Sequence, residues 1–314
     1  MAMTELHVPV LLEPAVTALD LDDDAIVMDA TYGRGGHTRA ILDHLGPRGR
    51  LLVMDQDPSA VEHAQRHLGA DQRVSIHHGR FSELDSLLDG LGLMGRLNGL
   101  LMDIGVSSPQ LDDSARGFSF RDDGPLDMRM NTGTGPTAAE WLAEVDEDEL
   151  TRVIRDYGEE RYARRIARTI VKARAEQPIT GTARLAAVVA AGAGPSVPER
   201  HPATRTFQAI RIHVNDELGE LERALAGGVD ALAPGGRFVV ISFHSLEDRR
   251  VKQAWASLSR PPAASRRMPA VAPFRPRLRL VGKLVRPDAA ECQRNPRARS
   301  ARMRVAEKLS ELDA

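Results

Sequence analysis

The sequence predicts an α/β protein built on a doubly wound parallel sheet, with a mainly helical insertion after the fourth strand. Short apolar runs alternate with helical patterns through residues 25–104, as in chains wound around a parallel sheet. The alternation stops at Gly105 and returns near Pro234. Polar and glycine-rich clusters follow the predicted strands, where ligands bind in open sheets of this class.

The first part of the chain contains four predicted strands with helices between them. The strands are residues 25–30, 50–54, 74–77 and 97–104, and the helices are residues 37–45, 58–68 and 81–88. Pro58 suits the first turn of its helix. Residues 97–104 are nearly all apolar, as expected for a strand that is covered on both faces.

In the middle of the chain the alternation of strands and helices gives way to a long loop followed by helices. Residues 105–136 are rich in Gly, Ser, Asp and Pro and too long for an ordinary connection, which indicates a functional segment. Helical patterns follow at residues 146–157, 159–176 and 182–191, and one amphipathic stripe runs from Phe207 to Leu225. We therefore expect one domain from residues 1–106 and 213–314, with residues 107–212 inserted as a second.

The last part of the chain returns to the sheet. We expect a turn at residues 234–236, a strand at 237–243 and a helix at 245–258. Residues 259–300 are Pro- and Arg-rich and look irregular, apart from a strand at 278–283. A final strand at 301–308 would complete a hairpin-like pair.

Composition narrows the classes of protein that fit. The 314 residues are 42% hydrophobic and 27% charged, an ordinary soluble balance. No window approaches the roughly 18 apolar residues of a membrane span. The first 14 residues, which include Glu5 and His7, lack the basic-then-apolar order of a signal peptide.

Cys292 is the only cysteine, so a disulfide within the chain is excluded and a cysteine-based zinc site is disfavoured. We expect a cytoplasmic protein with no metal and no membrane contact; a homodimer is compatible with the sequence.

Charge is unevenly distributed along the chain. Residues 1–150 carry 27 Asp and Glu against 11 Lys and Arg, whereas residues 260–314 carry 5 against 14. A basic tail on an acidic body suggests a polyanionic partner. A solvated tail with no partner explains the same pattern.

Each predicted strand is followed by a residue or turn suited to binding a nucleotide-like ligand. The turn Gly33-Arg34-Gly35-Gly36-His37 allows positive φ angles and close backbone approach, and the helix after it offers free N–H groups. Asp55 can accept hydrogen bonds from both ribose hydroxyls, and Phe81 can flank an adenine ring. A dinucleotide fingerprint would need glycine where Thr38 stands. Tight structural packing remains the alternative explanation of the turn.

The segment after the fourth predicted strand points to a particular chemistry. Asp103-Ile104-Gly105-Val106-Ser107-Ser108-Pro109-Gln110 stands where amino-directed methyltransferases carry an Asp/Ser-Pro-Pro-aromatic motif. An exocyclic base amine is a poor nucleophile because its lone pair is delocalised into the ring. A carboxylate can accept a hydrogen bond from the amine, orient it and favour the positive charge that develops on nitrogen. A cap or loop hydrogen bond would equally explain Asp103 taken alone.

Several longer motifs occur in order along nearly the whole chain. They are His7–Leu12, Thr31–Thr38, Asp103–Asp112, Arg116–Phe120, Gly124–Met130, Tyr157–Arg161, His201–Ala209, Ser242–Arg249 and Asn295–Ser300. With these motifs the chain closely resembles the bacterial 16S rRNA cytosine-N4 methyltransferase family, called RsmH or MraW. Tyr32 departs from the pattern, since many relatives have Phe there.

The resemblance implies a class I (Rossmann-like) methyltransferase fold, with the helical insertion recognising the substrate. It implies S-adenosyl-L-methionine as cofactor and N4-methylation of a decoding-centre cytidine in 16S rRNA of the small ribosomal subunit. The cofactor contacts that it implies are Gly35, Gly36, His37, Asp55, Phe81, Asp103 and Gln110.

Further residues are candidates for contact with the reacting base or with RNA. Beside Asp103, the catalytic candidates are Ser107 and Ser108, which contact the cytosine or merely end the strand, and His244, a proton acceptor or a structural turn residue. The candidates for contact with RNA phosphates are Arg116, Arg121, Arg129, Arg297, Arg299 and Arg302, since phosphate contacts supply most nucleic-acid affinity. Asp127 is a candidate for contact with the substrate. Loop packing would equally explain Asp127. A stacked base would have to be extruded to reach the site.

Two other functions remain open from the sequence. A nicotinamide-dependent oxidoreductase would use the same turn, although the third glycine is missing and the loop after Asp103 has no role in it. A non-catalytic ribosome-binding protein would retain the cofactor pocket only as a structural remnant. The sequence leaves the oligomeric state and the proton acceptor undetermined.

Overall fold

The computed structural model describes residues 9–194, 201–261 and 274–310, which form two compact units. The sheet unit contains the described residues up to Gly105 and from Leu218 onward, and the helical unit is Val106–Glu217. The unit boundary at Glu217 lies five residues beyond the expected end of the insertion. The expectations that involve Glu5, His7 and Val8 fall outside the described residues.

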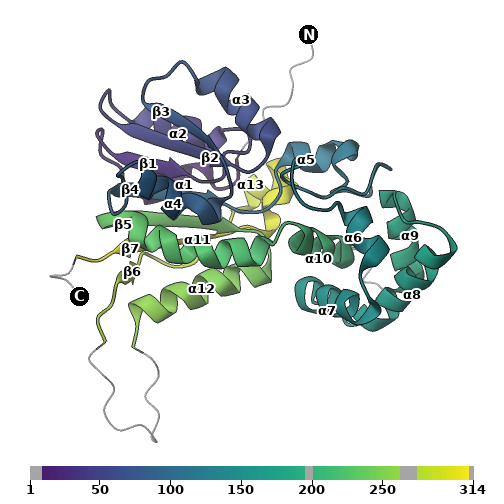
Figure 1. Ribbon diagram of the computed structural model, residues 1–314. Coiled ribbons are helices and arrows are strands. Elements are labelled where there is room, and N and C mark those ends of the chain that lie inside the picture. The colour runs from purple at the N-terminus through teal and green to yellow at the C-terminus, as the bar shows by residue number, and fades with distance from the viewer. Residues whose placement is uncertain (1–8, 195–200, 262–273, 311–314) are drawn as a thin grey trace, which may run out of the picture. The chain divides into compact units, whose positions relative to one another are not determined.

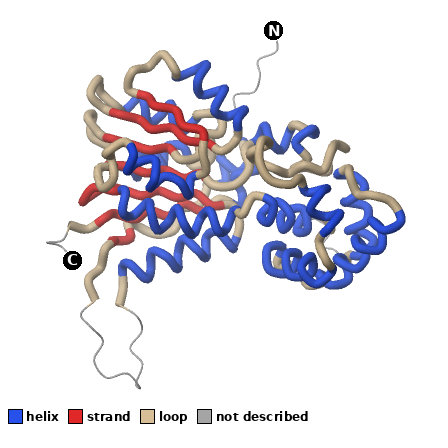
Figure 2. Tube along the Cα trace, viewed as in Figure 1, coloured by secondary structure: helices blue, strands red, loops and turns tan. Residues whose placement is uncertain are grey.

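A seven-stranded sheet organises the sheet unit (Figures 1 and 2). Its strands are β1 (Ile26–Asp29), β2 (Arg50–Asp55), β3 (Val74–His78), β4 (Leu97–Asp103), β5 (Leu232–Ser242), β6 (Leu278–Leu280) and β7 (Arg302–Lys308), in the order β3-β2-β1-β4-β5-β7-β6. The first five strands pair in parallel, and β7 is antiparallel to both β5 and β6. The winding direction reverses between β1 and β4, so their carboxyl ends form the switch point where ligands bind in such sheets.

Helices cover both faces of this sheet. Because side chains alternate along a strand, Val27 of β1 joins one apolar cluster and Met28 joins the other. The first cluster includes α1 (Leu12–Leu19), α2 (Gly36–His44) and α3 (Pro58–Leu68). The second includes α4 (Leu84–Gly90), α11 (Glu217–Ala231) and α12 (Ser245–Ser259). This two-sided covering explains why the parallel strands are almost continuously apolar.

The helical unit has an apolar core of its own. Its helices are α5 (Ser108–Asp112), α6 (Ala138–Glu144), α7 (Glu147–Gly158), α8 (Ala163–Glu176), α9 (Thr182–Gly192) and α10 (Thr204–Val214). Ile154, Ile166, Leu185 and Ile210 from four of these helices are fully buried together. No helix in the described part of the chain is both long and apolar enough to cross a membrane.

The expectation of one helix beneath the Phe207–Leu225 stripe is wrong. α10 ends at Val214 and α11 begins at Glu217, with Asp216 between them at a φ of 49°. The Asn215 amide is used in a loop of the helical unit, where its Nδ2 donates to the Met128 carbonyl at 2.8 Å. The apolar stripe continues across the break because Val214 and Leu218 are four residues apart, so periodicity cannot reveal it.

Other elements also differ from the predictions. The segment 259–300 is not irregular throughout, because it contains α13 (Ala289–Arg294) and a 3₁₀ turn, η3 (Pro296–Ser300). β6 and β7 therefore pair without a tight hairpin turn. The expected turn at 234–236 lies inside β5, where the register with β4 shifts and Gly235 has a φ of 79°. The helices α1 and α6 have no predicted counterpart.

Replacing Gly228 by alanine should destabilise the sheet unit. A Cβ at Gly228 on α11 would lie 2.5 Å from the Phe238 ring of β5, so the helix would have to move off the sheet. Overpacking of this kind costs about 1–3 kcal/mol. Urea unfolding followed by circular dichroism measures the change in the free energy of unfolding.

The matched control is Gly90→Ala at the end of α4, where a Cβ would meet no heavy atom within 4 Å. We expect this variant to be unchanged or slightly more stable, because alanine is the better helix former. Equal stability of the Gly228→Ala variant and the parent would show that α11 does not pack on β5 as described.

Candidate active site

The turn between β1 and α2 is held at both ends by the buried side chain of Asp29. One carboxylate oxygen accepts from the Thr31 N–H at 3.1 Å, and the other accepts from the Thr38 hydroxyl at 2.6 Å. Gly35 caps α2 with a φ of 72°, and a Cβ there would lie 2.5 Å from the Tyr32 ring. Only glycine fits this position, because both its φ and its close approach to Tyr32 exclude a side chain.

The N-terminal segment packs directly on this turn. A Cβ at Gly36 would lie 1.9 Å from the Pro9 ring, so this ring occupies the space that a side chain would need. His37 is 6% exposed, and its Nε2 lies 3.1 Å from the Val10 carbonyl. A carbonyl can only accept, so Nε2 carries the hydrogen in this contact. The Nδ1 atom of His37 is then directed toward Asp103, 3.7 Å from its Oδ2.

Asp55 ends β2 beside the same turn. Its two carboxylate oxygens accept from the N–H groups of Gly33 and Asp57, each at 2.8 Å. Burial raises the pKa of Asp55 to about 6, and the nearby carboxylates of Asp57 and Asp29 act in the same direction. Each carboxylate oxygen has a further acceptor position, so Asp55 can still accept from a ligand hydroxyl.

Phe81 follows β3 and begins a 3₁₀ turn, η1 (Phe81–Glu83). The residue before it, Arg80, forms an ion pair with Glu220 of α11 at 3.0 Å. Glu220 is 3% exposed and also pairs with Arg223 at 2.7 Å. This buried carboxylate therefore attaches the Phe81 turn to the helix that covers this face of the sheet.

Asp103 ends β4 at the switch point of the sheet. Its backbone N–H donates to the Thr31 hydroxyl at 2.7 Å, which ties β4 to the glycine turn. The side chain is 22% exposed, and its Oδ1 has no hydrogen-bond partner among the described residues. Burial raises the pKa of Asp103 well above its ordinary value, and the Asp29 and Glu247 carboxylates add to the effect. A partly buried carboxyl group with an unused oxygen is suited to accept from a ligand.

His244 follows β5 and acts as the N-cap of α12. Its Nδ1 accepts from the Glu247 N–H at 3.4 Å, and its Nε2 lies 2.9 Å from the Glu247 carboxylate. The other Glu247 oxygen accepts from the N–H groups of Phe243 and His244. Both ring nitrogens of His244 therefore face Glu247, which favours a capping role over proton acceptance in this arrangement.

Ser107, Ser108 and Gln110 lie in the helical unit, at the start of α5. Gln110 is 6% exposed, and its Oε1 accepts from the Ser107 N–H at 2.9 Å in a capping box. Ser108 is 8% exposed. Capping thus uses the Gln110 carbonyl oxygen.

The charged candidates at 116–129 also lie in the helical unit, where they brace a loop. An Arg116 guanidinium nitrogen donates to the carbonyls of Arg129 and Met130 at 3.0 and 2.9 Å. Arg129 pairs with Asp127 at 2.8 Å; burial would raise the pKa of Asp127, but hydrogen bonds from Arg129 hold it below its ordinary value. Arg121 is exposed and forms no ion pair with a described residue.

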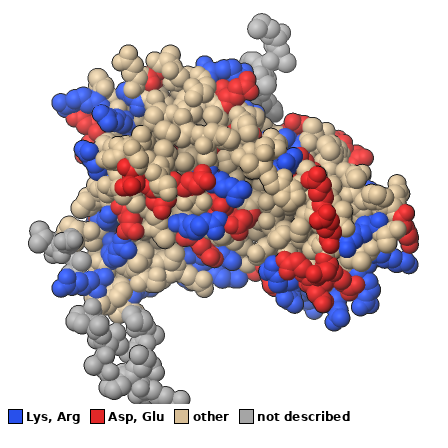
Figure 3. All heavy atoms as spheres, viewed as in Figure 1, with Lys and Arg blue, Asp and Glu red and all other residues tan. Residues whose placement is uncertain are grey.

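The tail arginines lie at the carboxyl edge of the sheet unit. Arg302 pairs with Ser242 across the antiparallel β5–β7 ladder, so η3 lies where β5 ends. Arg297 and Arg299 of η3 are exposed, whereas Arg302 forms an ion pair with Asp248 at 3.1 Å. Figure 3 shows both signs of charge interspersed on the face in view.

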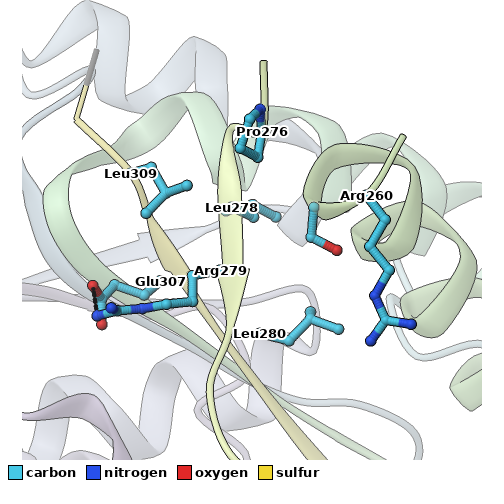
Figure 4. A pocket seen from close by; sticks show the side chains of 8 residues that line it. Arg260, Pro276, Leu278, Arg279, Leu280, Glu307 and Leu309 are labelled. Atoms are coloured by element: carbon cyan, nitrogen blue, oxygen red, sulfur yellow. Dashed lines mark hydrogen bonds and ion pairs between the residues drawn. The ribbon is translucent and has the colours of Figure 1, made fainter. Parts of the chain in front are cut away.

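A pocket of about 570 Å³ lies elsewhere in the sheet unit, against β6 and the end of α12 (Figure 4). Leu278, Leu280 and Arg260 line it, together with Glu307 of β7. Glu307 pairs with Arg237 near the start of the parallel run of β5, which is the amino edge of the sheet. The pocket is therefore at the opposite edge from Asp55 and Asp103.

The sheet unit thus brings together seven of the predicted site residues at one edge. These are Gly35, Gly36, His37, Asp55, Phe81, Asp103 and His244. Sequence reasoning missed Asp29, Val10 and Glu220, which hold this edge in place. The role of Asp29 could have been predicted from the sequence, because it is an acidic residue that ends an apolar run directly before the turn.

The edge fits S-adenosylmethionine by the character of its residues. The glycine turn offers close backbone approach and the N-terminus of α2, and Asp55 offers a hydroxyl-binding carboxylate. Asp103 offers a carboxyl oxygen that has no partner among the described residues. When bound, this cofactor would supply an electrophilic methyl group. The residues of the edge would bind the cofactor and orient the amine that receives the methyl group.

A family model and curated relatives show the family to which this chain belongs. The family model for the MraW methylase family matches residues 4–309. A ribosomal RNA small subunit methyltransferase H from Xanthomonas euvesicatoria pv. vesicatoria is 53% identical, covering 96% of this chain and 89% of the relative. One from Chromohalobacter salexigens is 54% identical, covering 96% and 92%. The solved structure of an rRNA methylase from Streptococcus thermophilus gives a TM-score of 0.44 at 12% identity, covering 98% and 100%.

Cofactor affinity should depend on pH through Asp55. Its pKa of about 6 means that lowering the pH through this value protonates the carboxylate and removes acceptor positions for ligand hydroxyls. We expect the Kd for S-adenosylmethionine to rise up to about tenfold per pH unit below pH 6. Calorimetric titration at several pH values measures it, and Asp55→Asn should bind weakly without a step near pH 6. An equal step in that variant would contradict the assignment.

The stability of the free protein should show the opposite dependence. The native pKa of Asp55 lies above its ordinary value of 3.8, so the folded state disfavours the ionised form. The contribution of Asp55 to stability is therefore fully present below pH 3.8 and is lost as the pH rises through about 6.

Proposed function

Because the chain belongs to the MraW methylase family, we propose that it methylates 16S rRNA of the small ribosomal subunit, with S-adenosylmethionine as donor. The acceptor in this proposal is the exocyclic N4 amine of a decoding-centre cytidine. The observation that carries the chemistry is Asp103 at the switch point, whose Oδ1 has no hydrogen-bond partner among the described residues and whose Oδ2 lies 3.7 Å from His37 Nδ1. A ribosomal substrate would make the cytoplasm its place of action.

Asp103 is suited to two tasks in methyl transfer to an amine. Its free oxygen can accept a hydrogen bond from the amine and aim the nitrogen lone pair at the methyl group. The cofactor would supply the methyl group, and the Asp103 carboxylate would stabilise the positive charge that develops on the amine nitrogen. The raised pKa of Asp103 also makes its ionised form a better acceptor for the proton that nitrogen then loses.

The remaining residues of the edge bind and orient in this proposal. Gly35 and Gly36 would let the backbone lie against the methionine end of the cofactor, Asp55 would hold the ribose, and Phe81 would flank the adenine. The family resemblance adds Gln110 as a cofactor contact, and Ser107 and Ser108 as candidates for contact with the cytosine. His244 would orient the loop after β5 through its capping contact with Glu247.

The helical unit presents a basic helix face suited to an RNA backbone. Arg164, Arg168 and Lys172 are exposed on α8 and, being four residues apart, lie on one side of it. Arg168 lies 3.6 Å from Glu147, whereas Arg164 and Lys172 form no salt bridge with a described residue. The opposite side of α8 is buried through residues such as Ile166. These cations support substrate recognition by the helical unit.

The substrate is tested by mapping methyl groups on small-subunit RNA from cells with and without this chain. We expect one cytidine N4-methyl group to disappear without it and to return when purified protein and S-adenosylmethionine are added. A chain that binds small subunits but transfers no methyl group would instead be a ribosome-binding protein. Binding of NAD in place of S-adenosylmethionine would favour an oxidoreductase.

Replacing Asp103 by asparagine should slow methyl transfer strongly while the cofactor still binds. The variant keeps the shape of the side chain but loses the charge that stabilises the developing ammonium group. We expect kcat to fall by about 100-fold or more, with the Kd for S-adenosylmethionine changing far less. Asp89→Asn, at an exposed position on α4, should behave as the parent. Full transfer by Asp103→Asn would exclude a catalytic role.

Neutralising the basic face of α8 should weaken binding to the RNA substrate. If the side chains at positions 164, 168 and 172 each contact a phosphate, changing all three to glutamine removes three counterion-releasing contacts. The slope of log K against log salt should then fall by up to about 0.7–0.9 per contact. Filter binding to undermethylated small subunits over a range of salt concentrations measures it.

The matched control changes three exposed arginines at the amino edge of the sheet, Arg48, Arg50 and Arg96, to glutamine. It removes the same charge far from the carboxyl edge of the sheet unit. An equal loss in both triple variants would indicate a general charge effect and contradict a contact by α8.

A further inference from the structure

The N-terminal segment is held by a side chain from the far end of the chain. Leu11 caps α1 in the left-handed region, with φ 54° and ψ 35°, and is only 2% exposed. Its backbone N–H donates to Oε1 of Glu291 at 2.7 Å, across 280 residues of sequence. Left-handed backbone is unfavourable for leucine, so a fixed acceptor for this N–H stabilises a conformation that the residue would otherwise avoid.

Glu291 itself is fixed by its own helix. It lies in the first turn of α13, where its N–H donates to the Asp288 side chain at 2.7 Å and its carbonyl accepts from the Asn295 N–H at 2.7 Å. The side chain is half-buried. An ionised carboxylate makes a shorter and stronger bond to a backbone N–H than a neutral acceptor does.

The residues next to Leu11 contact the predicted cofactor turn. The Val10 carbonyl is the partner of His37 Nε2 at 3.1 Å, which leaves His37 Nδ1 directed at Asp103. Pro9 lies against Gly36, which leaves no room for a side chain there. A rotation of the backbone at Leu11 would move both neighbours. The orientation of His37 therefore depends on how the Leu11 N–H is held.

We propose that Glu291 is a positioning residue for the cofactor site, acting through the Leu11 N–H and the Val10 carbonyl to set the ring orientation and tautomer of His37 beside Asp103. This rests on the proposed function only for the identity of the cofactor. The helix α13 contains none of the predicted site residues, yet through Glu291 it helps to shape the cofactor site.

The test compares Glu291→Ala, which removes the acceptor, with Glu291→Gln, which retains a carbonyl oxygen. The first readout is the Kd for S-adenosylmethionine by calorimetry. We expect an increase of about 10-fold or more for Glu291→Ala and substantial rescue by Glu291→Gln, as for other residues that orient ligand-binding groups. The second readout is the ¹⁵N chemical shifts of the His37 ring in the free protein, which should move toward a mixture of tautomers in Glu291→Ala.

Gln293→Ala, at an exposed position on α13, is the control and should match the parent in both readouts. A folded Glu291→Ala protein with parental affinity and parental His37 shifts would overturn the proposal, as would equal losses in Gln293→Ala. If Glu291→Ala does not fold, Glu291→Asp, which is too short to reach Leu11, replaces it with the same expectations. If the parent does not bind S-adenosylmethionine, the proposed function fails, while the His37 shifts still test the positioning.

Discussion

The hydrogen bonds accepted by the buried carboxylate of Asp29 are the constraint on which the candidate site depends. They join the first residues after β1 to the first turn of α2, so the glycine turn between them has little freedom. Thr31 then uses its hydroxyl to hold the Asp103 N–H, which carries the same constraint to β4. Burial raises the pKa of Asp29, and a bond from Thr38 offsets part of that effect. The carboxyl edge is thus one connected network.

The same network places several acidic groups close together. Asp29, Asp55 and Asp103 end three neighbouring strands, and each has a raised pKa because burial disfavours its charged form. Such an edge is unfavourable for stability when all three are ionised, and a cationic ligand would relieve the repulsion. S-Adenosylmethionine carries a sulfonium charge, so the electrostatics of the free edge are complementary to the proposed cofactor.

Several polar residues have a structural partner as well as a proposed functional role. Gln110 caps α5, His244 caps α12, and Arg116 braces the loop at Met130. Buried polar groups must be hydrogen-bonded within the protein, whether or not a ligand also uses them. A motif records only the residue type, so it cannot show whether the residue serves its structural partner or a ligand. Variants that keep the cap but alter the exposed atoms would separate them.

The sequence by itself determined the parallel sheet, its alternating helices and the clustering of Gly35, Asp55 and Asp103 at one edge, because the apolar period and the rule for strand ends are local properties. It did not reveal the break at Asp216, since the apolar spacing continues across it. Nor did it reveal the contact of Glu291 with Leu11, because no local pattern links residues 280 positions apart. Only the tertiary structure decided which atoms hold the turn, since hydrogen bonds between distant segments depend on how the chain packs.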